Sequence, residues 1–458
     1  MWKSYLSTFL RNKKIGILGF GREGQSTYRL LRSLLPDARI IIFDKSVIPN
    51  NPLNIEQDSY CTIYTGPGYL QNINNCAVVV KSPGIPMKEL KVIAFDGILT
   101  SQSDLFMKCF AGQIIAITGT KGKSTTSSLL SHTLKQAGKK VIFVGNIGIP
   151  PFDEIAKIQP DTLIVYEISS HQLECISASP HIAVLLNIFQ EHLDHYDSYT
   201  DYQNAKFKIG QYQDKKDFFI YNADNDIIAK HISKEIPHGI LLPFSEKTAF
   251  EKGCYIDKDS IHINYNGQSY IVSSTFERQL KGRHNLVNMA VVMLICKLLD
   301  INEADMFKAF ACFKVLPHRL EWAGTYNGKI FYNDSIATIP EATIEAIKTF
   351  AEVDTLIAGG FDRNIDYDNF ARFLSTSCVR NIVFTGDAGL RIYKLMENLN
   401  SGKKIYYNRH FDEAVKHAVL LTAENKICLL SPAAASYGTF NNFEERGKRF
   451  CDIISGTV

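Results

Sequence analysis

The residues TGTKGKST, from Thr118 to Thr125, are the feature that most constrains how this chain can fold. The apolar run QIIAI comes before them, and a helix-like stretch, STTSSLLSHTLKQAG, continues from them to Gly138. A glycine-rich loop between a buried strand and a helix points backbone N–H groups at phosphate oxygens. The full GxxxxGK[ST] pattern is broken because Ile117 stands where the first glycine would be. The segment predicts an α/β domain with a nucleotide-phosphate site at the end of a parallel strand.

Three side chains of this loop carry the chemistry that phosphate transfer needs. Lys123 is placed to pair with the terminal phosphates, the Ser124 hydroxyl suits Mg²⁺, and the Thr125 hydroxyl suits a phosphate oxygen. A lysine-bearing turn without a ligand is the alternative, but strand, loop and helix are all present in the expected order. We therefore expect the chain to hydrolyse a nucleotide or to transfer its phosphoryl group.

Strand-like and helix-like segments alternate along the 458 residues and predict three α/β domains. We expect a Rossmann-like domain over 1–110, a central mononucleotide-binding domain with a parallel sheet over 111–315, and a second Rossmann-like domain over 316–458. The last domain holds the strand-like runs KIFYND, DTLIAGG, NIVFTG, KIYYN and KICLLS. Residues 253–275 change to an alternating pattern with an Asn-Gly pair, which predicts an antiparallel insertion in the central domain.

A second glycine loop, GFGREG, lies near the start of the chain. Gly19, Gly21 and Gly24 have the GxGxxG spacing between a strand-like run and a helix-like run, and Asp44 closes the next strand-like run. This context is typical of a dinucleotide site, with the acid on ribose hydroxyls. Any ligand with a diphosphate would suit the same helix N-terminus, and a tight turn that binds nothing is the alternative. NAD(P) is therefore only one of the ligands that this loop allows.

Acids and histidines follow two of the predicted central strands. Glu167 ends the run TLIVYE, and the segment EHLDH, from Glu191 to His195, comes after the next strand. Lys206 lies 14 residues beyond His192 on a helical stretch. Glu, His and hydroxyl groups suit Mg²⁺ held together with phosphates, and the spacing is not that of a zinc site. Each residue alone has an ordinary structural explanation, but their order behind the phosphate loop indicates a metal-assisted site.

Charge and cysteine content exclude several classes of protein. The 50 Lys and Arg residues nearly balance the 47 Asp and Glu residues, for a net charge of +3, which argues against a nucleic-acid binder. No apolar run approaches the roughly 18 residues that span a bilayer, and the N-terminus does not look like a signal peptide. The ten cysteines form no CxxC pair and are expected to be buried free thiols. We expect a cytoplasmic protein that acts on small molecules as a monomer.

Taken together, the motifs resemble those of the Mur ligases, ATP-dependent amide-forming enzymes of peptidoglycan synthesis. The resemblance covers nearly the whole chain and rests on TGTKGKST, GNIGIP, YEISSHQLE, EHLDHY with AKFKI, GRHNLVN, LPHRLEW, YNDSIAT, AGGFDRN and SPAAASYGTFNNFEERG. An NAD-dependent oxidoreductase would explain neither the phosphate loop nor the acidic cluster. A non-catalytic regulator on the same scaffold would be expected to lose Lys123, Glu167, His192 or Lys206. Folylpolyglutamate synthetases resemble the second and third domains but lack the first.

The resemblance implies an activity. Glutamate, by default D-glutamate, would be ligated to UDP-N-acetylmuramoyl-L-alanine through an acyl phosphate, with release of ADP and phosphate. The amine of the amino acid would attack the acyl phosphate, and closure of the domains would exclude water.

The resemblance also assigns residues to each substrate. Those implied to bind the UDP-linked substrate are Gly21, Arg22, Glu23, Asp44, Lys45, Ser82, Pro83, Gly84 and Asn146. Those implied to bind ATP are Gly119, Thr120, Lys121, Gly122, Lys123, Ser124, Thr125, Asn285, His318, Arg319 and Asp334. Those implied to bind the amino acid are Thr338, Arg363, Ser436 and Phe443.

Two Mg²⁺ ions and a modified lysine are implied at the catalytic centre. Ser124 and Glu167 would hold one ion, and His192 would hold the second together with a carbamate on Lys206. The catalytic residues implied by the resemblance are Lys123, Glu167, His192 and Lys206. A shielded lysine with a lowered pKa can react with CO₂, and the product is an anionic oxygen ligand where an ammonium group would repel the metal.

Four positions depart from the pattern of the resembled family. Ile336 replaces a lysine expected near the amino acid, Lys121 replaces an asparagine, Arg363 stands where some relatives have lysine, and Gly438 replaces a common aspartate. One interpretation is neutral drift, with Arg363 compensating by a bidentate pair to a carboxylate. The other is a changed amino acid, with L-glutamate as the first candidate.

Overall fold

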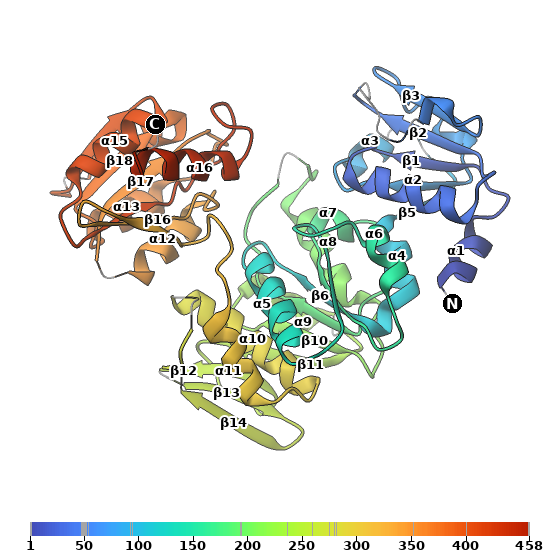
Figure 1. The fold of residues 1–458 in the computed structure, drawn as a ribbon, viewed down its shortest axis with the longest axis horizontal. Helices are drawn as coiled ribbons and strands as arrows, with labels where there is room; N and C mark the ends of the chain where they lie inside the picture. Colours follow the sequence, from blue (N-terminus) through green and yellow to red (C-terminus); the bar gives the residue numbers. More distant parts are fainter. Residues whose placement is uncertain are drawn as a thin grey trace. The chain divides into compact units, whose positions relative to one another are not determined.

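The computed structural model describes residues 2–46, 53, 55–91, 93, 95–192, 195–235, 237–258, 260–273, 275–278, 280, 282–350, 352–399 and 401–456. Three sheets form within them, and the chain packs as two compact units (Figure 1). The first unit comprises residues 1–277 and 287–311 and contains two sheets; the second comprises 278–286 and 312–458 and contains the third. Helices connect the strands in each of the three sheets, so the fold is α/β, as the alternating sequence pattern predicts.

The first sheet has five parallel strands in the order β3-β2-β1-β4-β5. Its strands are β1 (Ile15–Leu18), β2 (Ile40–Asp44), β3 (Cys61–Thr65), β4 (Val78–Lys81) and β5 (Ile98–Ser101). Its helices are α1 (Trp2–Leu10), α2 (Arg22–Leu34), α3 (Met87–Lys91) and α4 (Gln102–Phe110). β1 and β4 are buried throughout, which explains why their residues are apolar except for Lys81 at the end of β4. The strand order reverses between β1 and β4, and ligands of open α/β sheets bind at such a point.

The second sheet has nine strands in the order β14-β13-β12-β11-β10-β9-β6-β8-β7. Its strands are β6 (Ile114–Thr118), β7 (Val141–Gly145), β8 (Leu163–Glu167), β9 (Ile182–Leu185), β10 (Phe218–Asn222), β11 (Ile240–Ser245), β12 (Gly253–Asp257), β13 (Ser260–Tyr265) and β14 (Gln268–Ser273). Its helices are α5 (Lys123–Gln136), α6 (Pro151–Glu154), α7 (Ser170–Leu173), α8 (Tyr199–Gln211), α9 (Asp226–Lys234), α10 (Arg283–Leu298) and α11 (Glu303–Cys312). The predicted antiparallel insertion is confirmed: β12, β13 and β14 pair antiparallel, and Asn266-Gly267 forms the turn between the last two.

The third sheet has six strands in the order β15-β16-β20-β17-β18-β19. They are β15 (Glu321–Tyr326), β16 (Lys329–Asn333), β17 (Val353–Gly359), β18 (Asn381–Thr385), β19 (Lys404–Asn408) and β20 (Ile427–Leu430). The helices are α12 (Pro340–Thr349), α13 (Asp368–Thr376), α14 (Gly386–Glu397), α15 (Phe411–Leu421) and α16 (Phe443–Ile454). The five predicted strands are confirmed, whereas the edge strand β15, which pairs antiparallel with β16, was not anticipated.

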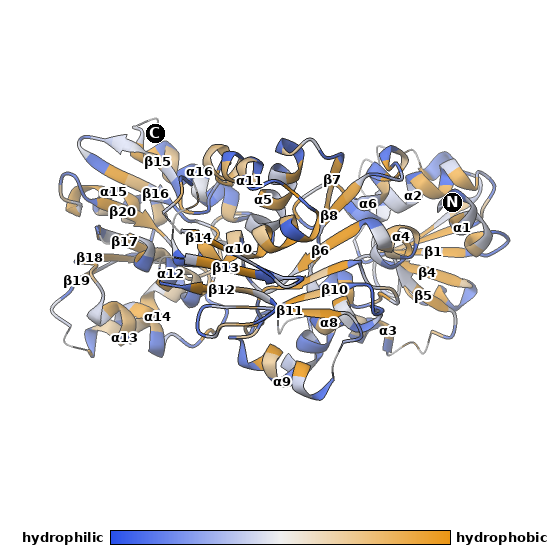
Figure 2. Ribbon diagram, turned by 90° about the horizontal axis from the view of Figure 1, so that it is seen from below, coloured by the Kyte–Doolittle hydropathy of each residue, from blue (hydrophilic) through white to orange (hydrophobic). Residues whose placement is uncertain are grey.

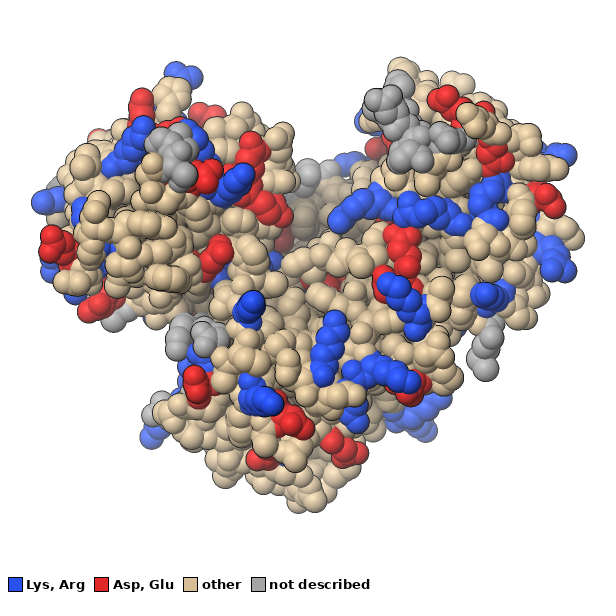
Figure 3. All heavy atoms as spheres, viewed as in Figure 1, with Lys and Arg blue, Asp and Glu red and all other residues tan. Residues whose placement is uncertain are grey.

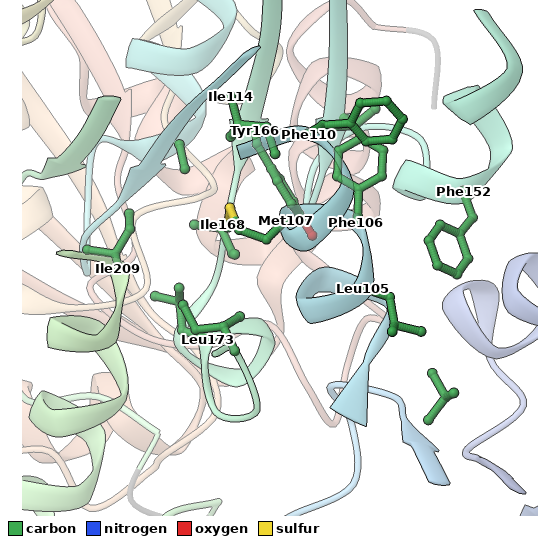
Figure 4. Close-up of a cluster of buried hydrophobic side chains, with 14 of the residues drawn as sticks. Leu105, Phe106, Met107, Phe110, Ile114, Phe152, Tyr166, Ile168, Leu173 and Ile209 are labelled. Carbon is green, nitrogen blue, oxygen red and sulfur yellow. The ribbon is translucent and has the colours of Figure 1, made fainter. Parts of the chain in front are cut away.

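One hydrophobic core joins the first two sheets. Helix α4 follows the last strand of the first sheet, and its Phe106 ring packs edge-on against Tyr166 of β8 with 5.9 Å between ring centroids. The Tyr166 hydroxyl also lies 2.7 Å from Ser103 Oγ of α4. Figure 4 shows Phe106 and Phe110 beside Tyr166, with Phe152 of α6 nearby. Burial of these aromatic rings stabilises the two sheets as one unit.

The strands are coloured largely as hydrophobic in Figure 2, and hydrophilic residues are frequent in the connecting loops. On the face drawn in Figure 3, basic and acidic side chains are interspersed, in keeping with the small net charge. Within the described residues, no helix combines the length and the apolar character needed to cross a bilayer.

All ten cysteines are free, as predicted, but the expectation that they are buried is only partly correct. Four are buried, four are half-buried, and Cys312 and Cys378 are exposed. Cys312 is the last residue of α11, and Cys378 lies in the connection between α13 and β18, so both exposed thiols lie outside the sheets.

Candidate active site

A cleft of about 360 Å³ lies at the carboxyl ends of β1 and β4 in the first unit. It contains most of the residues predicted to bind the UDP-linked substrate: Gly21, Arg22, Glu23, Asp44, Ser82, Pro83, Gly84 and Asn146. Lys45 is the one predicted member that does not line it. Residues from the second sheet, among them Ser169, His171 and Gln172, form the rest of the wall.

The first glycine loop is held by tight backbone contacts. A Cβ atom at Gly24 would lie 2.1 Å from the carbonyl oxygen of Gly19, so only glycine fits at this start of α2. The Asp44 carboxylate accepts the Phe20 N–H at 2.7 Å and the Ser46 N–H at 2.8 Å. Oδ2 of Asp44 therefore fixes the glycine loop, whereas Oδ1 holds the turn after β2; the structure thus gives Asp44 a role besides the ribose contact that the spacing suggests.

Glu23 joins the loop to the second sheet and was not singled out for this contact by the sequence. Its Oε1 accepts a hydrogen bond of 2.6 Å from Gln172 Nε2 of α7. Its Oε2 is buried and has no hydrogen-bond partner among the described residues. Burial raises the pKa of Glu23 above its ordinary value, although the hydrogen bond from Gln172 opposes this shift.

The phosphate loop lies between β6 and α5, as predicted. Helix α5 begins at Lys123, whose Nζ donates to the carbonyl oxygens of Gly119 at 2.8 Å and Thr120 at 2.9 Å. The lysine thus folds back over its own loop, where it can exchange these neutral acceptors for phosphate oxygens.

Glu167, at the end of β8, connects the phosphate loop with the cleft. Its Oε1 lies 3.2 Å from Ser124 Oγ of the loop and 3.1 Å from Asn146 Nδ2 of the cleft. Its Oε2 is buried and unpartnered within the described part of the chain. A buried carboxylate oxygen beside a hydroxyl fits a hard cation such as Mg²⁺.

Lys206 is buried on α8, with 1% of its surface exposed. Its Nζ donates to the Gly119 carbonyl oxygen at 2.9 Å and lies 4.9 Å from the centroid of the Tyr202 ring. Burial, reinforced by Lys123 and Lys121, lowers the pKa of Lys206 well below its usual range. The lowered pKa favours the neutral amine, which is the form that reacts with CO₂.

His192 lies at the edge of the same site. Its backbone has a φ of +59°, its side chain is 40% exposed, and its Nε2 is 3.7 Å from Glu191 Oε2. Although burial opposes ionisation, Lys121 and His192 hold the pKa of Glu191 down to about 2. Lys121, the unexpected residue of the loop, pairs with this carboxylate at 3.1 Å. Asp194, which the sequence also suggested, lies outside the described residues.

The described residues contain no group of three or more His, Cys, Asp and Glu side chains suited to a metal ion. The predicted metal set differs from such a group because it relies on a hydroxyl and a modified lysine as well as Glu167 and His192. The buried, unpartnered oxygen of Glu167 is the observation that fits a cation.

The second unit holds the remaining predicted residues. Asp334 follows β16, and its carboxylate accepts the Leu320 N–H at 3.2 Å and the Ser431 hydroxyl at 2.7 Å. His318 Nδ1 lies 2.9 Å from Asn333 Nδ2. Asn285 and Arg319 belong to this unit as well, so the predicted ATP residues are divided between the two units.

Arg446 of α16 was missed by the sequence reasoning. It is 2% exposed and donates to Ser335 Oγ at 3.0 Å, to the Ser335 carbonyl at 2.7 Å, and to the Ala434 and Ala435 carbonyls at 3.1 Å. Burial lowers the pKa of Arg446 to about 9. The residue fixes the segments that carry Thr338 and Ser436, and its place in the motif FNNFEERG was the only available signal.

Comparison with known proteins shows the family. Residues 117–296 match the Mur ligase middle domain, and residues 318–434 match the family described as Mur ligase, glutamate ligase domain. The UDP-N-acetylmuramoylalanine–D-glutamate ligases of Acetivibrio thermocellus and Clostridium kluyveri are 33% and 32% identical to the chain. The alignments cover 97% and 98% of this chain, respectively, and 97% of each relative.

Solved structures show the same fold at lower identity. MurC from Thermotoga maritima matches with a TM-score of 0.60 at 18% identity, over 98% of this chain and 100% of that one. MurF from Acinetobacter baumannii matches with a TM-score of 0.62 at 14% identity, over 96% of this chain and 93% of that one. Because full-length relatives exceed 30% identity and two domains match, this chain belongs to the Mur ligase family.

Proposed function

We propose that the chain ligates D-glutamate to UDP-N-acetylmuramoyl-L-alanine, with conversion of ATP to ADP and phosphate, in the synthesis of peptidoglycan precursors. Ligases of this family use ATP and Mg²⁺. The observation that carries the proposal is Glu167, whose Oε1 contacts Ser124 of the phosphate loop and Asn146 of the cleft. A nucleotide phosphate and the carboxylate of a substrate in the cleft would meet at this point.

Each of the three expected domains would bind a different substrate. Residues 1–110 would hold the UDP part of the substrate, 111–315 would bind ATP, and 316–458 would bind the amino acid through Thr338, Arg363, Ser436 and Phe443. We place the reaction in the cytoplasm and expect the enzyme to act as a monomer.

The chemistry follows from the groups in the first unit. A carboxylate is a poor acyl donor, so its oxygen attacks the γ-phosphorus of ATP, the bond to the ADP oxygen breaks, and an acyl phosphate forms. The amino group then attacks the acyl carbon, phosphate leaves, and the nitrogen loses a proton. Lys123 and the N-terminus of α5 stabilise the phosphoryl charge during the first step. Two Mg²⁺, when bound, supply the further positive charge that this transfer needs.

Four residues would hold the metal ions. Ser124 and Glu167 would contact one ion, and His192 would contact the other together with Lys206 as its carbamate. In the carbamate, the neutral Lys206 nitrogen bonds to the carbon of CO₂, one C=O double bond becomes a C–O⁻ single bond, and the nitrogen loses a proton. The buried position of the amine and its lowered pKa support this modification.

A panel of amino acids tests the proposed reaction. With Mg-ATP and UDP-N-acetylmuramoyl-L-alanine present, we expect ADP release to depend on D-glutamate, and not on L-glutamate, D-aspartate or L-aspartate. Coupled release of ADP and mass spectrometry of the product are the measurements. Turnover with L-glutamate alone would show that the enzyme is specific for the L-amino acid and that Ile336 and Gly438 occur together with this changed specificity. ADP release that no amino acid stimulates would overturn the proposed function.

A further inference from the structure

Arg363 lies on a loop of the second unit whose backbone is joined to a second segment. The loop follows β17, and the Phe361 N–H donates to the Ala435 carbonyl at 2.9 Å in an isolated antiparallel bridge. Arg446 donates to the same carbonyl at 3.1 Å from the buried side. The two segments are therefore held together, and the residues that follow Ala435 are placed beside the residues that follow Phe361.

Two exposed aromatic rings meet where these segments join. Phe361 is 43% exposed and Tyr437 is 53% exposed, and their ring centroids are 6.3 Å apart at an interplanar angle of 80°. Gly438, one of the departures from the family pattern, has a φ of +83° that an aspartate would adopt only with strain. The glycine thus allows the turn directly after Tyr437.

The guanidinium group of Arg363 lies over the Tyr437 ring, with 5.4 Å between its central carbon and the ring centroid. Its neighbour Asp362 is already paired with Arg391, at 2.6 Å and 2.9 Å, so this carboxylate is held away from Arg363. Among the described residues, Arg363 forms no ion pair. A guanidinium stacked on a ring keeps its N–H edge available for a carboxylate.

We propose that Tyr437 is a positioning residue that holds the Arg363 guanidinium ready for a carboxylate of the incoming amino acid, with Phe361 supporting the ring. The inference rests on the proposed function, which places Arg363 at the amino acid. It explains how a chain with Ile336 in place of the usual lysine retains an oriented cation: one arginine with a fixed plane offers two parallel N–H groups. The ligand class is a dicarboxylic amino acid.

Substitutions at Tyr437 separate a cation–ring contact from simple packing. Tyr437→Leu keeps apolar bulk but removes the ring, and we expect the KM for glutamate to rise roughly fivefold to thirtyfold, with kcat and the KM for ATP within about twofold. Tyr437→Phe retains the ring face and is expected to rescue the low KM. Trp322→Ala, which removes another exposed aromatic ring of the same unit, is the control and should leave the KM for glutamate unchanged.

A double-variant cycle with Arg363 decides between the outcomes. In an Arg363→Ala background, Tyr437→Leu should raise the KM for glutamate no further, because the group that it positions is gone. An unchanged KM in Tyr437→Leu, or an equal increase in both backgrounds, would overturn the inference while leaving the ligase reaction intact. Failure of the unsubstituted enzyme to use any amino acid would instead overturn the proposed function.

Discussion

Replacing Lys206 with methionine is expected to lower kcat by about a hundredfold to a thousandfold at ordinary Mg²⁺ concentrations without weakening the fold. Methionine fills much of the space of the lysine stem but cannot form a carbamate, so a charged ligand of the proposed metal site is lost. Lys206→Ala should lower kcat similarly. The measurements are steady-state ADP release and the thermal unfolding temperature of each variant.

Stability at different pH values distinguishes a catalytic lysine from a structural one. The folded state holds Lys206 with a strongly lowered pKa, whereas the unfolded state has the ordinary value of about 10.4. Between these values the unfolded chain binds one more proton, so the lysine lowers the free energy of unfolding as the pH falls below about 10. In CO₂-free buffer with chelator, Lys206→Met should therefore be more stable than the unsubstituted protein at pH 7, and the difference should shrink by pH 10.

Lys216→Ala is the matched control, because this lysine is 79% exposed in the same unit. It should change neither kcat nor the pH dependence of stability. If Lys206→Met kept full kcat, Lys206 would have no part in the mechanism. If its kcat fell only together with its unfolding temperature, the residue would be structural.

The sequence predicted the elements that depend on local pattern. Buried parallel strands such as β6, β8 and β17 are largely apolar runs, and the Asn-Gly turn at 266–267 defined the antiparallel insertion. The strands β3, β5, β10, β11 and β15 were not identified. β15 is an edge strand with a bulge and mixed exposure, so its sequence has neither a continuous nor a strictly alternating pattern.

The candidate site was predicted only where a motif covers it. The loop lysine, Glu167 and Lys206 follow from motifs, but the contacts of Glu23, Arg446 and Tyr437 join segments that are far apart in sequence. Such contacts depend on how the sheets pack, and a single sequence holds no direct record of that packing. The Ser103–Tyr166 contact is of the same kind, since it joins two regions that were expected to be separate domains.

The second large effect is expected on stability, from substitution of Lys81, which forms a buried ion pair with Glu174 beside the substrate cleft. At the end of β4 it is 1% exposed, and its Nζ lies 2.8 Å from Glu174 Oε2 and 2.7 Å from the Ile85 carbonyl oxygen. Glu174 also accepts from His195 Nε2 at 2.7 Å. Burial alone would raise the pKa of Glu174, but His195 and Lys81 hold it below the usual value. The pair thereby joins the wall of the cleft in the first sheet to the segment after α7.

Lys81→Met is expected to lower the free energy of unfolding by about 3–5 kcal/mol, because it leaves the Glu174 carboxylate buried without its main cation. Denaturant unfolding at pH 7 measures this loss. Adding Glu174→Gln should recover most of it, since the uncompensated charge is then gone. Because Ile85 lines the cleft, the KM for the UDP-linked substrate should rise in Lys81→Met.

The pH dependence of this loss and an exposed ion pair test the explanation. In the unsubstituted protein, ionised Glu174 stabilises the fold above its unfolded pKa of about 4.3, and this contribution disappears as the pH falls through the lower folded value. The loss of unfolding free energy caused by Lys81→Met should therefore be largest near neutral pH and become smaller at acidic pH. Lys91→Met breaks an ion pair of the same 2.8 Å length whose side chains are 63% and 45% exposed, and it should leave unfolding unchanged. If both substitutions lowered the free energy of unfolding equally, burial would not make the Lys81–Glu174 pair more important for stability than an exposed pair.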